Sequence, residues 1–536
     1  QDKKSFVYKY IFPEQEFKLK KGRSVIIANN TDPNRADYAG KIQELDHINK
    51  SLLLRKGISK DQNKLPRILS ISEKVMEHAR FENLNRNIYL FCENVLNKKE
   101  GFEAIKSFLN RDIPSIKGKK AGEKIIETEN FTDEIPKVIN NLNNSYLYLQ
   151  GPPGSGKTYQ AANAILELIK RNKKIAITAN SHKVIHNLLE RIEGLAKNKK
   201  HTFKGLKMGN VENDDTFFDG KFVKTEKNEK HFINQLKDDK TLLYAGTKYH
   251  LSQKFYQNKL DYLFVDEASQ ISVADLVALG GIAKNIILVG DNAQLSQPVK
   301  GNHPGESGKS VLDYLLQGKD TILDSHGVFL KKTYRLHPNL NDFISENFYE
   351  NRLLINEKNI NRKIDYKKSS IIQSEGIHTI LMKHEDRSQT SLEEFETVKK
   401  LMDQLIGSKF RDFDNSERKI SVNDILIVSP FNAQVNFLKS RLHKDTKIGT
   451  IDKFQGMEAP ITIISMTSSS VEDLPRNKKF FFNRNRLNVA ISRAQCSSII
   501  LMNPKLLEAP PSDYEEFKLL NYFQKLMKFE RKIDIN

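Results

Sequence analysis

The chain of 536 residues contains no tryptophan and only two cysteines, Cys92 and Cys496. Two cysteines are too few for a disulfide framework, a cysteine-rich zinc site or a four-cysteine iron–sulfur cluster. No stretch reaches the roughly 18–20 consecutive apolar residues of a membrane-spanning helix, and the first residues lack a signal-peptide pattern. These absences predict a cytoplasmic protein with no membrane contact.

Positive charge is what the chain has in excess, since 86 Lys and Arg against 67 Asp and Glu give a net charge of +19. The excess is concentrated in residues 1–120, which contain 25 basic and 15 acidic residues. A polyanionic partner such as nucleic acid is one interpretation, and a generally lysine-rich proteome is the other. The length predicts about three or four domains.

The N-terminal part changes its pattern once along the chain. Residues 1–66 alternate apolar and polar positions, which predicts a small β-barrel or sheet with a hairpin at residues 40–57 that turns near His47. From residue 67 apolar residues recur at helical spacing, and the stretch 111–124 is basic and contains glycine. We therefore expect a helical stalk and a basic linker over residues 67–124.

From residue 125 onward, short apolar runs alternate with helical stretches, as in parallel sheets covered by helices on both faces. The predicted strands lie at residues 146–149, 175–179, 242–245, 262–265 and 286–289, and then at 379–382, 425–428, 461–464 and 498–501. The fold class is therefore α/β, with two tandem domains over residues 125–329 and 330–536. The polar stretch 385–420 fits a surface helix and loop.

The strongest motif is a glycine-rich loop that fits G-x-x-x-x-G-K-[ST] in full: Gly151-Pro152-Pro153-Gly154-Ser155-Gly156-Lys157-Thr158. It lies between a predicted strand and the helical run 161–169, the context in which such a loop binds phosphate. Backbone N–H groups and the helix N-terminus would face the phosphates. Lys157 would neutralise the β- and γ-phosphates, Thr158 would bind Mg²⁺, and Tyr159 belongs to the same predicted site. A similar segment at 305–310 lacks the first glycine, and we expect a loop and a helix start there.

Two adjacent carboxylates, Asp266 and Glu267, follow the predicted strand at 262–265. In P-loop enzymes the first such carboxylate holds the Mg²⁺ shell, and the second orients or deprotonates the attacking water. A further strand ends in Gly290-Asp291 and is followed by Gln294, whose amide could sense the γ-phosphate. Gly-Asp after a strand is also an ordinary turn.

Four more segments follow in order: Tyr334-Arg335-Leu336-His337-Pro338, Val428 to Gln434, Gly449 to Pro460 and Asn485 to Ala494. With the loop and the carboxylates, this ordered series resembles the motifs of superfamily 1B helicases. That branch includes the nonsense-mediated-decay RNA helicase and the Okazaki-fragment nuclease–helicase. The sequences of residues 178–183 and 298–304 are similar in particular to the helicase half of bacterial proteins that fuse a RecB-like nuclease to such a helicase. The resemblance spans residues 146–502.

The resemblance implies two RecA-like domains with ATP and Mg²⁺ bound between them. Tyr334 matches the family's tyrosine that stacks on adenine, and Glu458 matches an acid near the ribose. The family also has a glutamine upstream of the loop that reads adenine, but residues 121–149 contain no glutamine. Use of GTP or CTP therefore stays open.

The resemblance further implies that three residues link nucleotide hydrolysis to domain closure. Gln294 matches the glutamine that connects the γ-phosphate to the nucleic-acid side. Arg335 and Arg493 match two arginines that reach the γ-phosphate from the second domain, where they would stabilise charge on the transferring group. Without the resemblance, Arg335 fits a surface arginine at a helix end equally well.

A last set of positions is implied to hold single-stranded nucleic acid, in loops expected opposite the nucleotide cleft. The matching residues are Ser181, His182, Lys183, Thr247, Pro430, Asn432 and Thr450. Hydroxyls, amides and N–H groups at strand ends suit phosphate contacts, although helix caps and turns use the same residue types. The aromatic stripe Phe6, Tyr8, Tyr10 and Phe12 would either stack on bases or form the core of the N-terminal region.

We therefore predict an ATP-dependent helicase or translocase that moves 5′→3′ on single-stranded DNA, with RNA as an alternative track. A second alternative is a clamp or remodeller that uses NTP to switch its grip without unwinding. A third is a nuclease, because Glu16-Phe17-Lys18 and Glu516-Phe517-Lys518 contain a Glu-x-Lys triplet, although neither has a convincing aspartate partner. A nuclease domain or partner upstream of Gln1 is the more plausible source of cleavage.

Overall fold

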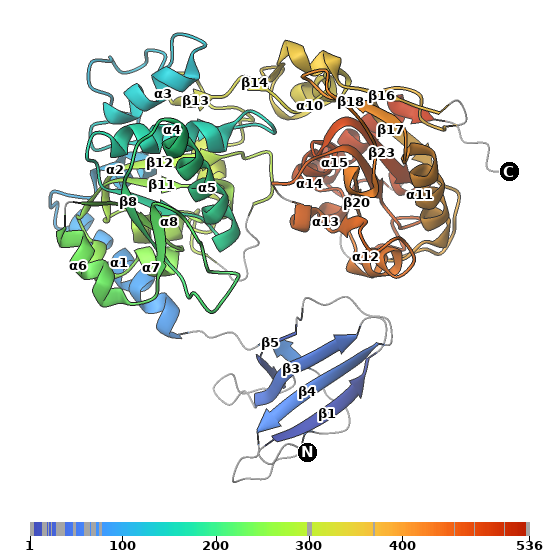
Figure 1. Ribbon diagram of the computed structural model, residues 1–536, viewed down its shortest axis with the longest axis horizontal. Helices are drawn as coiled ribbons and strands as arrows, with labels where there is room; N and C mark the ends of the chain where they lie inside the picture. Colours follow the sequence, from blue (N-terminus) through green and yellow to red (C-terminus); the bar gives the residue numbers. More distant parts are fainter. Residues whose placement is uncertain are drawn as a thin grey trace.

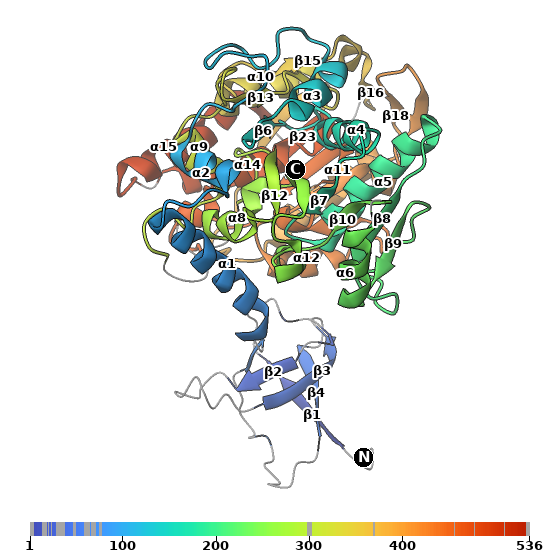
Figure 2. The same ribbon diagram turned by 90° about the vertical axis from the view of Figure 1, so that its left-hand side faces the viewer.

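The computed structural model describes residues 5–12, 19, 21–22, 24–27, 38–46, 50–57, 65, 71–73, 78–238, 240–296, 303–367, 370–454, 456–475, 478–508 and 510–531. Figure 1 shows two α/β bodies next to each other and a smaller antiparallel sheet apart from both. In the view turned by 90°, helix α1 (His78–Leu96) leads from that small sheet to the first body (Figure 2).

The N-terminal sheet has the strand order β1-β4-β3-β2-β5. Its strands are β1 (Ser5–Ile11), β2 (Ser24–Ile27), β3 (Tyr38–Asp46), β4 (Ser51–Gly57) and β5 (Ile71–Glu73). The antiparallel pairing of β3 with β4 confirms the predicted hairpin, whose turn at residues 47–49 lies outside the described residues. Tyr8, Tyr10 and Phe12 are partly buried against the core of this sheet, which favours the core interpretation of the aromatic stripe. The barrel remains a prediction.

The helical region starts later than its spacing suggests. The first helices are α1 and α2 (Glu103–Asn110), whereas Ile71 lies in strand β5, where pairing with β2 overrides the local apolar spacing. Asn87 fixes α1 to the first body, because its buried Nδ2 donates hydrogen bonds to the carbonyls of Ser252 and Ala278, each at 2.9 Å.

The basic stretch 111–124 packs against the first body. Arg111 donates from Nε to the Tyr314 carbonyl at 2.9 Å, and its guanidinium lies 3.7 Å from the centre of the Tyr314 ring. Arg111 also pairs with Glu306 at 2.8 Å. The predicted linker is therefore anchored at its start.

The first α/β body contains an eight-stranded parallel sheet in the order β13-β6-β12-β11-β7-β10-β8-β9. The strands are β6 (Tyr146–Gln150), β7 (Ile175–Thr178), β8 (Lys204–Met208), β9 (Val223–Glu226), β10 (Thr241–Ala245), β11 (Leu260–Val265), β12 (Ala283–Gly290) and β13 (Gly327–Phe329). The five strands predicted for this region are confirmed as β6, β7, β10, β11 and β12. Their central residues are mostly apolar because both faces of the sheet are covered. Strands β8, β9 and β13 were not predicted, since they lie toward the sheet edges and are short or carry charged residues.

Helices cover both faces of this sheet, as Figure 1 shows. They are α3 (Phe131–Asn140), α4 (Lys157–Ile169), α5 (His182–Asn198), α6 (Glu229–Lys237), α7 (Lys248–Leu251), α8 (Val273–Leu279) and α9 (Val311–Leu316). The helical run predicted at 161–169 belongs to α4. The segment 305–310 precedes α9, and its last residue, Ser310, accepts a hydrogen bond from the Leu312 N–H as the N-cap.

The second α/β body contains a six-stranded parallel sheet in the order β21-β20-β22-β23-β17-β24. Its strands are β17 (Gly376–Leu381), β20 (Ile425–Val428), β21 (Lys447–Gly449), β22 (Ala459–Ser465), β23 (Ala494–Met502) and β24 (Glu530–Arg531). All four strands predicted in this region are confirmed. Its helices are α10 (Pro338–Phe348), α11 (Leu392–Leu405), α12 (Asn432–Lys439), α13 (Lys478–Phe481), α14 (Arg484–Ile491) and α15 (Tyr514–Gln524).

Short strands complete this half of the chain: β14 (Lys332–Thr333), β15 (Leu354–Ile355), β16 (Lys363–Asp365), β18 (Lys409–Arg411) and β19 (Glu417–Lys419). The stretch 385–420 therefore contains a helix, as expected, and also an antiparallel pair, β18 and β19, that its polar composition did not reveal.

None of the helices that the structure describes combines the length and apolar character of a membrane span. Of the two Glu-x-Lys triplets, residues 516–518 lie on helix α15 and residues 16–18 lie outside the described part of the chain. Within the described residues, no three His, Cys, Asp or Glu side chains group as metal ligands.

Candidate active site

A cavity of about 440 Å³ lies between the two bodies, at the edge where the strands of the first sheet end. Parallel strands bring the loops that follow them to one edge, so residues far apart in the sequence meet there. The predicted residues that line the cavity are Pro152, Pro153, Gly154, Ser155, Gly156, Lys157, Thr158, Tyr159, Asp266, Glu267, Gln294, Arg335, Glu458 and Arg493. Gly151 and Tyr334 are not among its lining residues.

The glycine-rich loop is shaped by Gly154 and Gly156, which have φ angles of 72° and 79°. A Cβ at Gly154 would come within 2.4 Å of the Arg335 Cβ, so the loop packs directly on the second body. The Gly154 carbonyl accepts a hydrogen bond from the N–H of Tyr334 at 2.8 Å. Tyr334 is therefore held beside the loop, with 56% of its surface exposed.

The loop also contains an orphaned polar atom. Among the described residues, the buried Ser155 Oγ has no hydrogen-bond partner. Buried hydroxyls are almost always paired, so this one fits a ligand that supplies the partner. A glycine-rich loop with an unpaired buried hydroxyl at the start of a helix suits a phosphate group.

The acidic side of the cavity is formed by the two carboxylates after β11. Lys157 Nζ lies 3.1 Å from Glu267 Oε1, and the Glu267 N–H donates to Asp266 Oδ1 at 2.9 Å. Burial and then the Glu267 charge raise the pKa of Asp266 to about 7, although Lys157 opposes the shift. A divalent cation at this position would favour the ionised form of Asp266. The Asp266 carboxylate and the Thr158 hydroxyl are oxygen donors that Mg²⁺ accepts, so the residues present fit this ion.

Two arginines reach the cavity from the second body. Arg335 Nε lies 2.5 Å from Glu458 Oε2, and its Nη1 donates to the Ser492 carbonyl at 3.1 Å. Arg493 is 2% exposed, and its Nη2 lies 3.5 Å from Gln294 Oε1 of the first body. Burial lowers the pKa of Arg493, but a guanidinium keeps its proton in proteins. A cationic group of the second body thus meets a polar group of the first across the cleft.

Seven further residues line the cavity without having been predicted to: Val184, Asn187, Gln270, Asp452, Lys453, Gly456 and Arg191. Asn187 and Arg191 follow Lys183 at intervals of four residues along α5, so helical spacing could have placed all three on one face. Asp452, Lys453 and Gly456 lie in the segment Gly449 to Pro460, in which the resemblance gave roles only to Thr450 and Glu458.

The residues predicted to hold nucleic acid divide between the two bodies. Ser181 caps α5 by accepting a hydrogen bond from the Val184 N–H at 3.3 Å. Ser181 and Lys183 line the nucleotide cavity, so the expectation that these loops lie opposite the cleft is wrong for these two residues. The reason is topological: β7, which precedes them, lies next to β11, and both strands end at the same edge. Thr247 follows β10 at that edge and is half-exposed.

In the second body the three predicted residues also cluster at strand ends. The Ser429 N–H donates to the Gly449 carbonyl at 3.2 Å, which places Pro430 close to Thr450. Asn432 begins helix α12. Pro430 is buried, whereas Asn432 and Thr450 are half-exposed.

Comparison with known proteins identifies both bodies. Residues 136–299 and 308–505 each match a family described as an AAA domain. The DNA replication ATP-dependent helicase/nuclease of Schizosaccharomyces pombe is 26% identical over 66% of this chain and 26% of its own length. The DNA polymerase alpha-associated DNA helicase A of Saccharomyces cerevisiae is 24% identical over 77% of this chain and 68% of its own length. The Regulator of nonsense transcripts 1 homolog of Arabidopsis thaliana is 24% identical over 72% of this chain and 34% of its own length.

The glycine-rich loop, the paired carboxylates after a buried strand and the two parallel sheets define a P-loop nucleotide-binding protein. The relatives place it more narrowly, because helicases match across both bodies and support the assignment of this chain to superfamily 1B of the helicases. It spans about a quarter of the first relative, two thirds of the second and a third of the third.

Proposed function

We propose that this chain is an ATP-dependent helicase and translocase of single-stranded nucleic acid, with NTP hydrolysed between two RecA-like domains. The observation that carries the proposal is the contact of Arg493 with Gln294 in a cavity that Lys157 also lines. Hydrolysis then depends on the second body lying against the first, so each cycle of NTP binding and release can close and open the cleft.

The chain's own residues supply the chemistry of phosphoryl transfer. Lys157 exchanges its partner Glu267 for the phosphates, and Glu267 turns to orient and deprotonate the attacking water. Arg335 and Arg493 stabilise the negative charge of the transition state. Thr158 and Asp266 would hold Mg²⁺, which would neutralise phosphate charge when bound.

This site recognises the nucleotide base less specifically than it recognises the phosphates. Tyr334 stacks on the base, since it is exposed beside the loop, and Glu458 lies toward the ribose while holding Arg335. Stacking accepts any base, and residues 121–149 contain no glutamine to read adenine. We therefore propose that ATP is preferred weakly over GTP and CTP.

The track is single-stranded DNA in preference to RNA, with 5′→3′ movement. Two of the three relatives carry DNA in their names and the third carries nonsense transcripts. The strand would be held through its phosphates by the loops that carry His182, Thr247, Asn432 and Thr450. The accessory regions 1–66 and 67–124 add salt-dependent affinity through their basic excess, next to motor domains at 125–329 and 330–536.

The test is NTP hydrolysis at one fixed salt concentration without nucleic acid, with single-stranded DNA and with single-stranded RNA. We expect ATP turnover to be strongly stimulated by DNA, less by RNA, and to be shared in part by GTP and CTP. A rate that neither polymer changes would refute the motor. A forked duplex decides between the motor and the alternative clamp, because a clamp would hydrolyse ATP without displacing a strand.

A pH experiment examines how His182 takes part. Burial and then Lys207 hold the pKa of His182 at about 4, so its imidazole is neutral at pH 7 and can hydrogen-bond to a phosphate but not pair with it as a cation. We expect the ratio of single-stranded DNA affinities of the wild type and His182→Asn to stay constant between about pH 5.5 and 8. A ratio that rises as the pH falls through about 6.5 would mean that His182 binds as a cation.

A further inference from the structure

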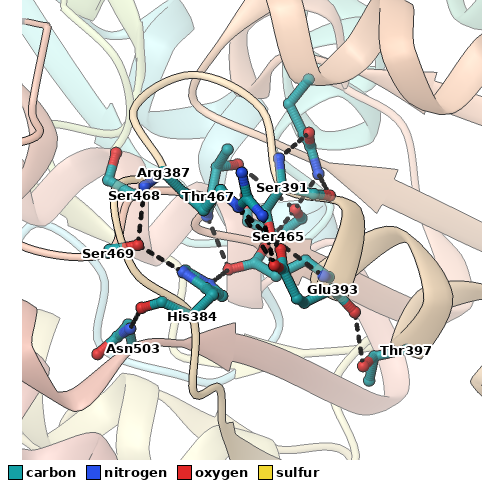
Figure 3. Close-up of polar contacts among 12 residues, drawn as sticks. His384, Arg387, Ser391, Glu393, Thr397, Ser465, Thr467, Ser468, Ser469 and Asn503 are labelled. Carbon is teal, nitrogen blue, oxygen red and sulfur yellow. Dashed lines mark hydrogen bonds and ion pairs between the residues drawn. The ribbon is translucent and has the colours of Figure 1, made fainter.

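A buried carboxylate in the second body takes no part in the chemistry above. Glu394 lies in the first turn of α11, and its side chain is 0% exposed. Its Oε2 accepts a hydrogen bond from Ser465 Oγ at 2.5 Å, and its Oε1 accepts one from the Thr467 N–H at 2.9 Å. His384 Nε2 lies 3.3 Å from the same Oε1. Figure 3 shows His384, Ser465 and Thr467 converging beside the start of α11.

Thr467, which this carboxylate holds, has an unusual backbone conformation. Its φ angle is 75°, in the left-handed region, although threonine is β-branched. Such a residue adopts this conformation where its surroundings enforce it, and such positions cluster at functional sites. The surroundings here are the N–H bond to Glu394 and the contact of Thr467 Oγ1 with Ser429 Oγ at 3.2 Å.

The same contacts continue to the loops with predicted nucleic-acid residues. Thr467 contacts Ser429, whose N–H reaches the Gly449 carbonyl at 3.2 Å. Ser465 accepts a hydrogen bond from Gln434 Nε2 of α12 at 3.1 Å. Ser429 and Gly449 immediately precede Pro430 and Thr450 in the chain, and Gln434 lies two residues after Asn432 on α12.

On its other side the carboxylate fixes a second loop. His384 Nδ1 lies 2.7 Å from Ser469 Oγ. The Ser469 N–H donates to the Arg387 carbonyl at 2.8 Å, and Ser469 Oγ accepts a hydrogen bond from the Arg387 N–H at 3.0 Å. The Arg387 side chain is 41% exposed. Hydrogen bonds thus connect the buried Glu394, directly or through one residue, to the loops that follow β17, β20 and β22.

We propose that Glu394, acting with His384 and Thr467, is a positioning group that fixes the nucleic-acid loops of the second body. The inference rests on the proposed function. The three residues lie outside the nucleotide cavity as the described residues define it. Their replacement should therefore change strand binding and leave nucleotide hydrolysis without nucleic acid unchanged.

The first test is Glu394→Gln, which keeps the shape of the side chain but replaces one acceptor oxygen with a donor among groups that already donate. We expect the Kd for a labelled single-stranded DNA, measured by anisotropy at fixed salt, to rise about tenfold. Basal ATP turnover should stay within about twofold of the wild type. The matched control is Glu396→Gln, two residues further along the same helix and exposed, which should bind like the wild type.

Thr467→Gly is the second variant, because glycine adopts a φ of 75° without strain. It should remain folded, and it should still bind DNA more weakly, since the loop loses both its Oγ1 contact and its fixed conformation. Normal DNA binding by both variants would refute this inference alone. Equal losses of basal turnover and DNA binding by Glu394→Gln would also refute it, because they indicate general unfolding. If the wild type binds no single strand, the proposed function fails and this inference with it.

Discussion

Replacing Lys157 with alanine is expected to reduce NTP turnover by about 10²–10³-fold, the scale of losing one preorganised donor to the transition state. Lys157 Nζ lies 3.1 Å from Glu267 in the wall of the cavity, where the phosphates would take its charge. The fold should survive, because Gly154, Gly156 and the preceding strand set the loop conformation. Steady-state turnover with and without single-stranded DNA, together with the thermal unfolding temperature, measures both effects.

The matched control for this variant is Lys309→Ala. Lys309 lies in the similar Gly-Lys-Ser segment before α9, but it pairs with Glu306 at 2.7 Å and does not line the cavity. We expect its turnover to equal that of the wild type. Turnover retained by Lys157→Ala would show that this loop does not bind the reacting phosphates, and the P-loop assignment would then be wrong.

Replacing Arg493 with alanine is expected to lower kcat by about 10³–10⁵-fold, the range for the loss of an arginine finger. Arg493 is 2% exposed, and its guanidinium contacts Gln294 of the first body and the Met457 carbonyl of the second, at 3.5 and 3.2 Å. It therefore contributes charge where the two bodies meet. Single-stranded DNA binding should be retained, because Arg493 lies in the nucleotide cavity.

Two further variants separate charge from packing at this position. Arg493→Lys keeps a positive charge but loses the planar fork of donors, so it should recover only part of kcat. Arg441→Ala removes an arginine whose guanidinium lies 3.8 Å from the centre of the Phe437 ring, away from the cavity, and should leave kcat unchanged. A loss of less than about tenfold for Arg493→Ala would remove this residue from the active site.

The features of this protein that depend on neighbours along the chain can be predicted from its residues alone. The loop from Gly151 to Thr158 is defined by the order of its residues, and a buried strand on one side and a helix on the other follow from local apolar patterns. All nine strands predicted in the α/β bodies pair with a strand on each side, and they carry enough apolar residues to be recognised.

Which distant residues meet is seen only in the folded chain, because contacts between separate segments leave no periodic trace in the sequence. The pairing of Arg335 with Glu458, the place of Ser181 in the wall of the nucleotide cavity and the burial of Glu394 beneath the loops of the second body are of this kind. Ile71 shows the same limit, since pairing with a remote strand overrides its helical spacing. The chemical groups can be identified from the sequence, and they meet in space because the parallel strands that carry them end at one edge of the sheet.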